Sequence, residues 1–505
     1  MKNLIKYILL IIWPIVFTSC EDYLEEDIKT FTSPEILMSS KNGVEQAVNG
    51  IYAAGKFRWW GGPREIFMLN GFPTDELVKT GASGSRWQLQ IYDWDPTNGN
   101  FTYPWNAFTQ GVVGANMVLD NFPEYGSLGI PDEKQFLDIK RGEALFLRGM
   151  HYFYFTNYFG EIPLLTSYND VELYPTNSTI TQLYDQIIAD LSEAEKLLPN
   201  WQDPIHVPGR ATRGAAKSFL GKAYLYRATS EAKDADDFQK AVSKFKEVID
   251  NEGYDLWDVY KRVFIPENKN GKEDIYSFQM ERDGQRSSGI YIESLPRPSP
   301  SGHKGRGNGT LSVFAANSFE EGDERKEDGW GGTSGLIFTG KFINRLTGDT
   351  LETNTDDKYY HEKYYDPVNS PLGATNMATN FPIMRYADVL LMYAEAINEA
   401  NKDPDNDAYW AINKVRERAG LDPLSDLSYD EFFDAIYYER LHELWAEGHR
   451  WLDMKRWGTQ QRAVDERGYN DTFYPPVTVE SKHYVFPIPQ VEIEANPNLK
   501  QNPGY

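Results

Sequence analysis

Residues 180–199 read ITQLYDQIIADLSEAEKLLP, and this stretch decides the fold. Its apolar residues recur every three or four positions, which is the spacing of one buried face of an α-helix. The helix is predicted to end at Pro199, because proline cannot continue the hydrogen-bonding pattern of a helix. The apolar face is formed by Ile180, Leu183, Tyr184, Ile187, Ile188, Leu191, Ala194 and Leu198.

The same spacing recurs on both sides of this stretch. Residues 133–158 predict a long helix before it, and two further helices are predicted, one that starts near Thr212 and one that stops at Gly253. Small residues in the Thr212 helix, among them Ala215 and Ala216, let a neighbouring helix approach closely. The helices follow one another about every 34 residues, which is the period of a tetratricopeptide array.

A second block of helices is predicted near the other end of the chain, at about residues 384–457. One helix begins near Tyr386, the next is closed by Gly420, and a third opens at a capping box made by Ser428 and Glu431. The predicted fold class is all-α dominated, with tetratricopeptide-like helix pairs in an α-α superhelix. Large loop-rich insertions with little β structure interrupt the pairs.

Two insertions, at about 55–105 and 255–380, lose the helical spacing and are rich in Gly, Pro, Ser and Asn, as in PRPSPSGHKGRGNGT at 296–310. We predict one domain over 43–505, with the first helical block at about 133–253 and the second as given above. Binding surfaces usually lie on such loops, because a rigid scaffold positions them without being deformed by them.

Cys20 is the only cysteine, and it follows a lysine-bearing start and an apolar run that ends in Thr18 and Ser19. This pattern predicts a signal peptide over residues 1–19. A cysteine directly after the small residues favours a bacterial lipoprotein, in which the Cys20 thiol carries a diacylglyceryl anchor with acyl chains such as palmitate, and 20–42 form a tether. The alternative is an ordinary secreted chain whose cysteine lies near the cleavage point by chance. A disulfide within the chain is excluded.

The charge of the chain is strongly negative. The formal net charge is −24, and removal of residues 1–19, with Lys2 and Lys6, would bring it to −26. So acidic a surface repels phosphate backbones and anionic lipid, which disfavours nucleic-acid binding. We therefore expect no nucleic-acid partner and a preference for neutral or cationic ligands.

Several strings, in this order along the chain, resemble the SusD/RagB family of surface glycan-binding lipoproteins. They include CEDYLE at 20–25, TDE at 74–76, RGEALFLRGMHYFYFTNYFGEIPL at 141–164, ERLHELWAEGHRWLDMKRWG at 439–458 and FPIPQVEIEANPNLKQNPGY at 486–505. The resemblance runs from Cys20 to Tyr505. It implies four tetratricopeptide-like helix pairs, a loop-rich ligand face, outer-membrane attachment and a TonB-dependent transporter partner of SusC type, over which the lipoprotein closes like a lid.

A sugar ring needs a flat aromatic platform for its C–H face and polar side chains for its hydroxyls. Aromatic and polar residues adjoin in KFRWWGGPREI at 56–66 and SGSRWQLQIYDWDPTNGN at 83–100. The alternative is packing in the core, which we assign to Trp105, Trp445, Trp451 and Trp457, while Trp94 is left open between the two roles. The glycan-binding candidates are Trp59, Trp60, Arg86, Trp87, Tyr291 and Trp330.

Catalysis and metal binding are not predicted. Asp75 and Glu76 are adjacent and would point to opposite faces of an extended backbone, whereas a glycosidase needs two carboxylates that flank one bond. His442 and Glu443 lack the HExxH spacing of a zinc site, and we assign these charges to a salt-bridged helix surface. The acids around Asp405 fail the EF-hand pattern and are predicted to cap the following helix. No cofactor is expected.

Three functions remain open at this point. The first is a lipid-anchored receptor that captures an oligosaccharide or polysaccharide and passes it to a transporter, without bond chemistry. The second is a helical scaffold that binds only a protein partner or peptide. The third is a glycoside hydrolase, for which the sequence offers no catalytic motif.

Overall fold

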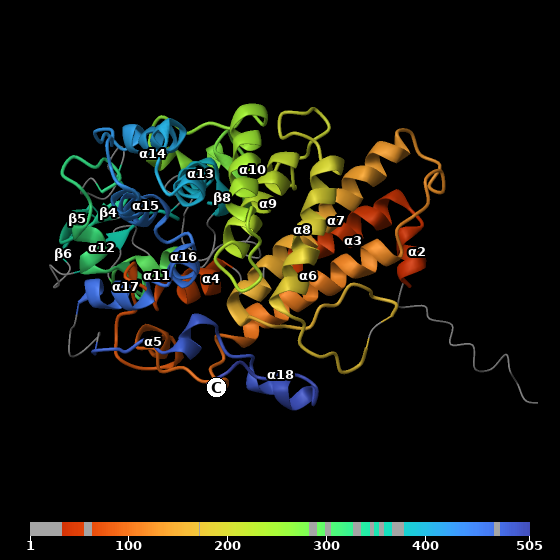
Figure 1. The fold of residues 1–505 in the computed structure, drawn as a ribbon, viewed down its shortest axis with the longest axis horizontal. Coiled ribbons are helices and arrows are strands. Elements are labelled where there is room, and N and C mark those ends of the chain that lie inside the picture. The colour runs from red at the N-terminus through yellow and green to blue at the C-terminus, as the bar shows by residue number, and fades with distance from the viewer. Residues whose placement is uncertain are drawn as a thin grey trace, which may run out of the picture.

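The structure is a computed structural model that describes residues 33–54, 63–170, 172–281, 290–297, 305–326, 335–343, 348–352, 358–365, 378–468 and 475–505. Helices form its frame, and most of the short helices and strands gather on the left of Figure 1, away from α2 and α18. The predicted signal peptide, Cys20 and the first part of the tether lie outside the described residues. The fold class predicted from the sequence is confirmed.

The frame is a row of helices in which each helix packs against the next (Figure 1). α3 packs on α6, and the row continues through α7, α8, α9 and α10 to α13, which also contacts α14 and α15. The bounds are α3 Lys41–Ala54, α6 Thr102–Asp120, α7 Glu133–Phe159, α8 Ile180–Leu197, α9 Arg213–Arg227, α10 Asp237–Asn251, α13 Tyr386–Asn401, α14 Asn406–Arg418 and α15 Tyr429–Leu444.

Local signals in the sequence set the ends of these helices. The Thr212 hydroxyl accepts the backbone N–H of Ala215 at the start of α9, and Asp405 caps α14 in the same way. Ser428 and Glu431 form the predicted capping box of α15. Each of these contacts satisfies a backbone N–H that a helix start leaves without a partner.

Small residues allow the helices to lie close together. A Cβ atom placed on Gly221 of α9 would lie 2.7 Å from the ring of Phe245 on α10, and one on Gly149 of α7 would lie 3.0 Å from Leu191 on α8. A side chain at Gly221 would require the Phe245 ring to move, and one at Gly149 would be in tight contact with Leu191. The prediction of close approach along α9 is thus confirmed.

Short elements fill the space beside the frame. The helices are α2 Pro34–Met38, α4 Pro63–Gly71, α5 Ser85–Gln90, α11 Ile290–Ser294, α12 Val313–Asn317, α16 Arg450–Trp457, α17 Gln460–Arg467 and α18 Gln490–Ala495, with 3-10 turns η2 Tyr260–Phe264, η3 Pro266–Asn268 and η4 Ser481–Tyr484. The strands are β1 Leu77–Val78, β2 Asp274–Phe278, β3 Thr310–Leu311, β4 Ile337–Phe338, β5 Lys341–Ile343, β6 Thr350–Glu352, β7 Tyr360–His361 and β8 Phe381–Arg385. They pair two by two and antiparallel, as β1–β3, β2–β8, β4–β7 and β5–β6.

The core takes in most of the tryptophans assigned to packing. Trp105, Trp445 and Trp451 are buried, and the Trp451 ring stacks on Phe486 with centroids 4.1 Å apart. Trp457 is half-buried against the core. Trp94, left open by the sequence, turns inward, and its indole N–H donates to the Tyr505 hydroxyl at 2.7 Å.

The charges around His442 and Glu443 are buried, so their assignment to a helix surface was wrong. The Glu443 carboxylate is fully buried and accepts ion pairs from Arg418 at 2.5 Å, Arg385 at 3.0 Å and Arg325 at 3.2 Å. Although burial would raise the pKa of Glu443, these arginines lower it to about 2. Salt bridges were predicted correctly, but they lie inside the molecule.

Among the residues that the structure describes, no helix has the length and apolar character needed to cross a membrane.

Candidate functional site

The two insertions meet at one place, which we call the insertion junction: α4, β1, α5, α11 and residues 305–311. Leu77 pairs with Leu311 and Val78 with Thr310 in the β1–β3 ladder. Two residues further along, the Thr80 hydroxyl donates to the Gly307 carbonyl at 2.5 Å. The insertions are therefore joined by backbone and side-chain bonds into one surface.

Three of the predicted glycan-binding residues belong to elements of this junction. Arg86 and Trp87 are consecutive on α5, and Tyr291 lies on α11. Helix α5 starts after Gly84, whose φ of 82° lies in the left-handed region that favours glycine. Trp59, Trp60 and Trp330 lie outside the described residues, so their part in the site stays a prediction.

Glu293 of α11 is the centre of an ion cluster. Its carboxylate contacts Arg64 of α4 at 2.5 Å and Arg306 at 2.9 Å, and Asn308 donates to it at 3.0 Å. Burial alone would raise the pKa of Glu293, but Arg64 in particular outweighs this effect, and the pKa is lowered. Glu293 is therefore ionised and ties the two insertions together.

Arg86 lies at the edge of this cluster. Its guanidinium is 3.9 Å from Glu293 and 4.0 Å from Glu65, and its side chain is 24% exposed. Both separations exceed hydrogen-bond distance, and no described residue accepts a hydrogen bond from this guanidinium. The planar guanidinium is thus partly exposed and makes no hydrogen bond to a described residue.

Glu65 of α4 is buried beside Arg86, and its Oε2 atom has no hydrogen-bond partner among the described residues. Burial raises the pKa of Glu65 to about 7, although Arg86 and Arg64 oppose the rise. At neutral pH this carboxyl is only partly ionised, so it neutralises Arg86 incompletely.

Trp87 is half-buried and belongs neither to the core nor to the partly buried residues that pack against it. Its indole N–H has no acceptor in the described part of the chain. A tryptophan that serves only as packing buries its ring in the core, as Trp105 does. Trp87 therefore differs from the core tryptophans in the position of its ring, whereas an indole N–H without an acceptor is also found at the buried Trp445 and Trp451.

Two family models match the chain, one described as the SusD family over residues 272–505 and one described as "Starch-binding associating with outer membrane" over residues 22–225. The chain belongs to the SusD/RagB family. It is 29% identical to SusD-like protein P25 of Formosa agariphila, over 100% of this chain and 99% of that protein. It is 26% identical to the starch-binding protein SusD of Bacteroides thetaiotaomicron, over 88% of this chain and 85% of that protein.

The fold agrees with solved members of the SusD superfamily. A crystal structure from Parabacteroides distasonis superposes with a TM-score of 0.80 at 25% sequence identity, covering 92% of this chain and 99% of the other.

Two of the strings that resemble the SusD/RagB family, TDE at 74–76 and the string at 439–458, contact each other and hold the junction to the frame. Asp75 of the TDE string accepts a bidentate ion pair from Arg450, with contacts of 2.5 and 2.8 Å, and Glu76 accepts the Ala446 N–H at 2.8 Å. Both carboxylates are buried. Their role is to anchor β1 on the α15–α16 turn, and neither can reach a dissolved polysaccharide.

Sequence reasoning missed four residues of the junction: Lys79, Glu293, Arg306 and, as a charged group, Arg64. None stands out alone, because each is an ordinary charged residue in a loop-rich stretch. The signal that could have found Arg64 and Arg306 is the excess of basic residues in two short stretches, 56–65 and 282–306, which together contain eight Lys or Arg and three Asp or Glu. Lys79 has no such signal. Glu293 could not be singled out from the sequence, because the chain has 75 acidic residues and their spacing does not show which of them pairs with which base.

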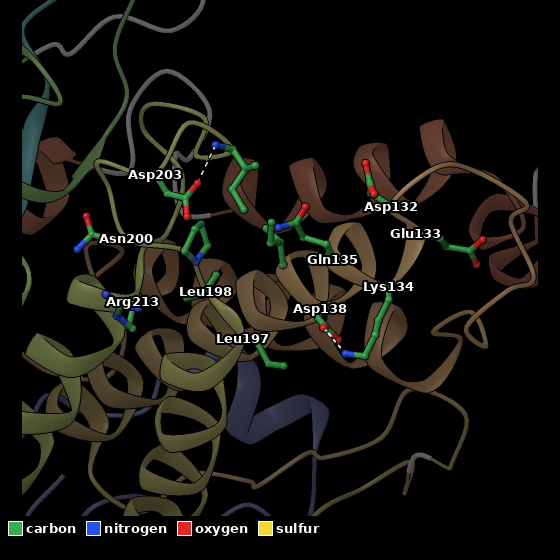
Figure 2. Close-up of a pocket in the computed structure, with 13 residues that line it drawn as sticks. Asp132, Glu133, Lys134, Gln135, Asp138, Leu197, Leu198, Asn200, Asp203 and Arg213 are labelled. Carbon is green, nitrogen blue, oxygen red and sulfur yellow. Dashed lines mark hydrogen bonds and ion pairs between the residues drawn. The ribbon is translucent and has the colours of Figure 1, made fainter.

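A cavity of about 940 Å³ lies elsewhere, between the first turn of α7, the end of α8 and the segment that leads to α9 (Figure 2). Acidic side chains such as Asp132, Asp138 and Asp203 outnumber the bases Lys134 and Arg213 along its wall. In the described part of the chain no tryptophan lines it, and neither Arg86 nor Trp87 does. The junction remains the better candidate for a sugar site.

One acidic cluster has the spacing of metal ligands, at Asp234, Asp236 and Asp237. Its charges are already paired: Arg227 contacts Asp237 at 2.6 Å and Asp234 at 2.7 Å, and Lys240 contacts Asp236 at 2.8 Å. Since these cations neutralise the carboxylates, the cluster is not assigned as a cation site.

Proposed function

We propose that this chain is a lipid-anchored receptor on the outer face of the outer membrane, held there through Cys20. It captures an oligosaccharide or polysaccharide at the insertion junction and delivers it to a SusC-type TonB-dependent transporter, without breaking bonds. The observation that carries this proposal is the pairing of Arg86 and Trp87 on α5. Arg86 offers N–H donors that make no hydrogen bond to a described residue, and Trp87 offers an aromatic ring outside the core.

Family membership supports the proposal. The starch-binding description of the model over residues 22–225 and the starch-binding relative from Bacteroides thetaiotaomicron both favour a saccharide ligand. Stacking of a sugar on an aromatic face and hydrogen bonds to its hydroxyls require no ionised catalytic pair. The buried positions of Asp75 and Glu76 favour binding over hydrolysis.

Replacement of Trp59, Trp60, Trp87 and Trp330 by alanine tests the proposal against a scaffold that binds only protein or peptide. We expect loss of glycan affinity in calorimetry, and about a five- to tenfold loss for Trp87→Ala alone, the effect of removing one aromatic contact. Association with the transporter should be unchanged. Trp410→Ala, which removes an exposed tryptophan of α14 outside the junction, is the control.

Two results would contradict the receptor. Wild-type protein that binds no member of a broad glycan panel would favour the scaffold. Reducing ends released from polysaccharide by the protein alone would favour the hydrolase.

A further inference from the structure

Positive charge is concentrated at the insertion junction, in contrast to the acidic chain as a whole. Among the described residues, Lys79, Arg64, Arg86 and Arg306 lie around two carboxylates, Glu65 and Glu293. The chain outside this place carries an excess of acids that brings the formal net charge to −24. The sign of the charge among these described residues is therefore opposite to that of the net charge of the chain.

The two described carboxylates are shared unequally among the cations. Glu293 is occupied by Arg64, Arg306 and Asn308. Glu65 is buried and only partly ionised, as described above. The Lys79 ammonium donates to the backbone carbonyls of Thr80 at 3.1 Å and Gly81 at 2.6 Å, which carry no net charge.

Of the three arginines, Arg86 is the one whose positive charge is least neutralised by neighbouring carboxylates. Elsewhere in the described chain, arginines with carboxylate neighbours contact them closely, as Arg450 does with Asp75 at 2.5 Å. The guanidinium of Arg86 keeps 3.9–4.0 Å from its two carboxylates and is partly exposed. A bidentate anion such as a carboxylate or a sulfate fits such a free fork.

The sequence next to these elements is also basic. The segments 55–62, 282–289 and 298–304, which adjoin α4 and α11 along the chain, contain five Lys or Arg residues and one Asp. Their composition points to the same charge preference as the described residues.

We propose that the saccharide taken at the junction is acidic, a glycan that bears carboxylate or sulfate groups, and that Arg86 binds its anionic group beside the Trp87 ring. This inference rests on the proposed function and specifies its substrate class. It replaces the expectation of a neutral or cationic ligand, which followed from net charge alone.

Calorimetry on the full-length chain in detergent tests the inference with four probes. These are oligosaccharides of polygalacturonate for carboxylate, of carrageenan for sulfate, and of amylose and laminarin as neutral comparators. We expect binding of at least one acidic probe at least tenfold tighter than of either neutral probe. Binding should weaken when NaCl rises from about 50 to about 500 mM, because salt screens exposed charges. The better of the two acidic probes identifies the anionic group.

Substitutions of Arg86 distinguish an effect of its charge on binding from an effect on folding. Arg86→Gln should weaken binding of the acidic probe about tenfold or more, Arg86→Lys should restore part of this loss because it keeps the charge but not the planar fork, and neutral probes should lose much less affinity in both variants. Arg262→Gln is the matched control, an exposed arginine paired with Asp258 outside the junction. Circular dichroism checks that each variant is folded.

The outcomes distinguish the two proposals. If neutral probes bind as tightly as acidic ones, or if Arg86→Gln changes nothing, the acidic class is wrong while the receptor stands. If a broad panel that includes these four probes gives no binding, the receptor itself fails.

Discussion

At the scale of the residue, the junction shows how neighbours decide what a charged group can do. Glu293 and Glu65 are both buried and both face arginines, yet the pKa of Glu293 is lowered and that of Glu65 is raised to about 7. The difference follows from contact distance, because Arg64 touches Glu293 at 2.5 Å whereas Arg86 stays 4.0 Å from Glu65. Burial therefore dominates at Glu65 and electrostatic attraction dominates at Glu293.

This difference predicts a pH dependence of binding. Glu65 carries a proton below about pH 7 and a negative charge above it, with Arg64, Arg86 and Glu293 as the charged groups around it. Protonation leaves Arg86 less compensated, so affinity for an acidic glycan should rise severalfold as pH falls from about 8 to about 6. Calorimetry across this range measures the effect. Glu65→Gln should bind tightly at both pH values, and an unchanged slope in that variant would show that another group titrates.

At the scale of the element, the sequence predicted the helices well and their buried charges poorly. The spacing of apolar residues in 180–199 sufficed for α8, and capping residues sufficed for the starts of α9, α14 and α15. These signals are local, so a single stretch of sequence contains them. The Arg86 and Trp87 neighbourhood was also visible locally, because both residues are adjacent on one short helix.

The burial of Glu443 was not visible in this way. Its partners Arg325 and Arg385 lie 118 and 58 residues away in sequence, and only the fold brings them to α15. Glu293 was missed for the same reason, since Arg64 is 229 residues from it. Pairing of charges distant in sequence depends on tertiary structure, which residue spacing does not encode.

The Glu443 network yields a prediction of stability. Glu443→Gln leaves Arg325, Arg385 and Arg418 buried with one carboxylate fewer, so we expect the free energy of unfolding to fall by about 3–5 kcal/mol. Urea denaturation followed by tryptophan fluorescence measures it. Glu193→Gln breaks an exposed pair with Lys196 and should change stability by less than about 0.5 kcal/mol. Equal effects from both variants would mean that the buried network contributes no more than a surface pair.

At the scale of the whole molecule, the proposed receptor would combine an acidic surface with a basic binding site at the junction. An acidic glycan is repelled by most of the surface and attracted at one place, which favours productive encounters over non-specific adsorption. The helical frame holds this place rigidly, through Asp75, Glu76 and the α15–α16 turn. What remains is to keep the junction close to a transporter in the same membrane, which is the role proposed for Cys20.

Cys20→Ala tests that role in the native cell. The variant should lose incorporation of labelled palmitate and move from the membrane to the soluble fraction, because acyl chains on the thiol are the only predicted attachment. Glycan affinity of the purified variant should match that of the wild type, since the junction lies on the folded frame and does not depend on the anchor. Ser19→Ala keeps a small residue before the cysteine and should remain labelled and membrane-bound. A Cys20→Ala protein that still sediments with the membrane would point to an attachment through the folded chain, and the tether over residues 20–42 would then have no anchoring function.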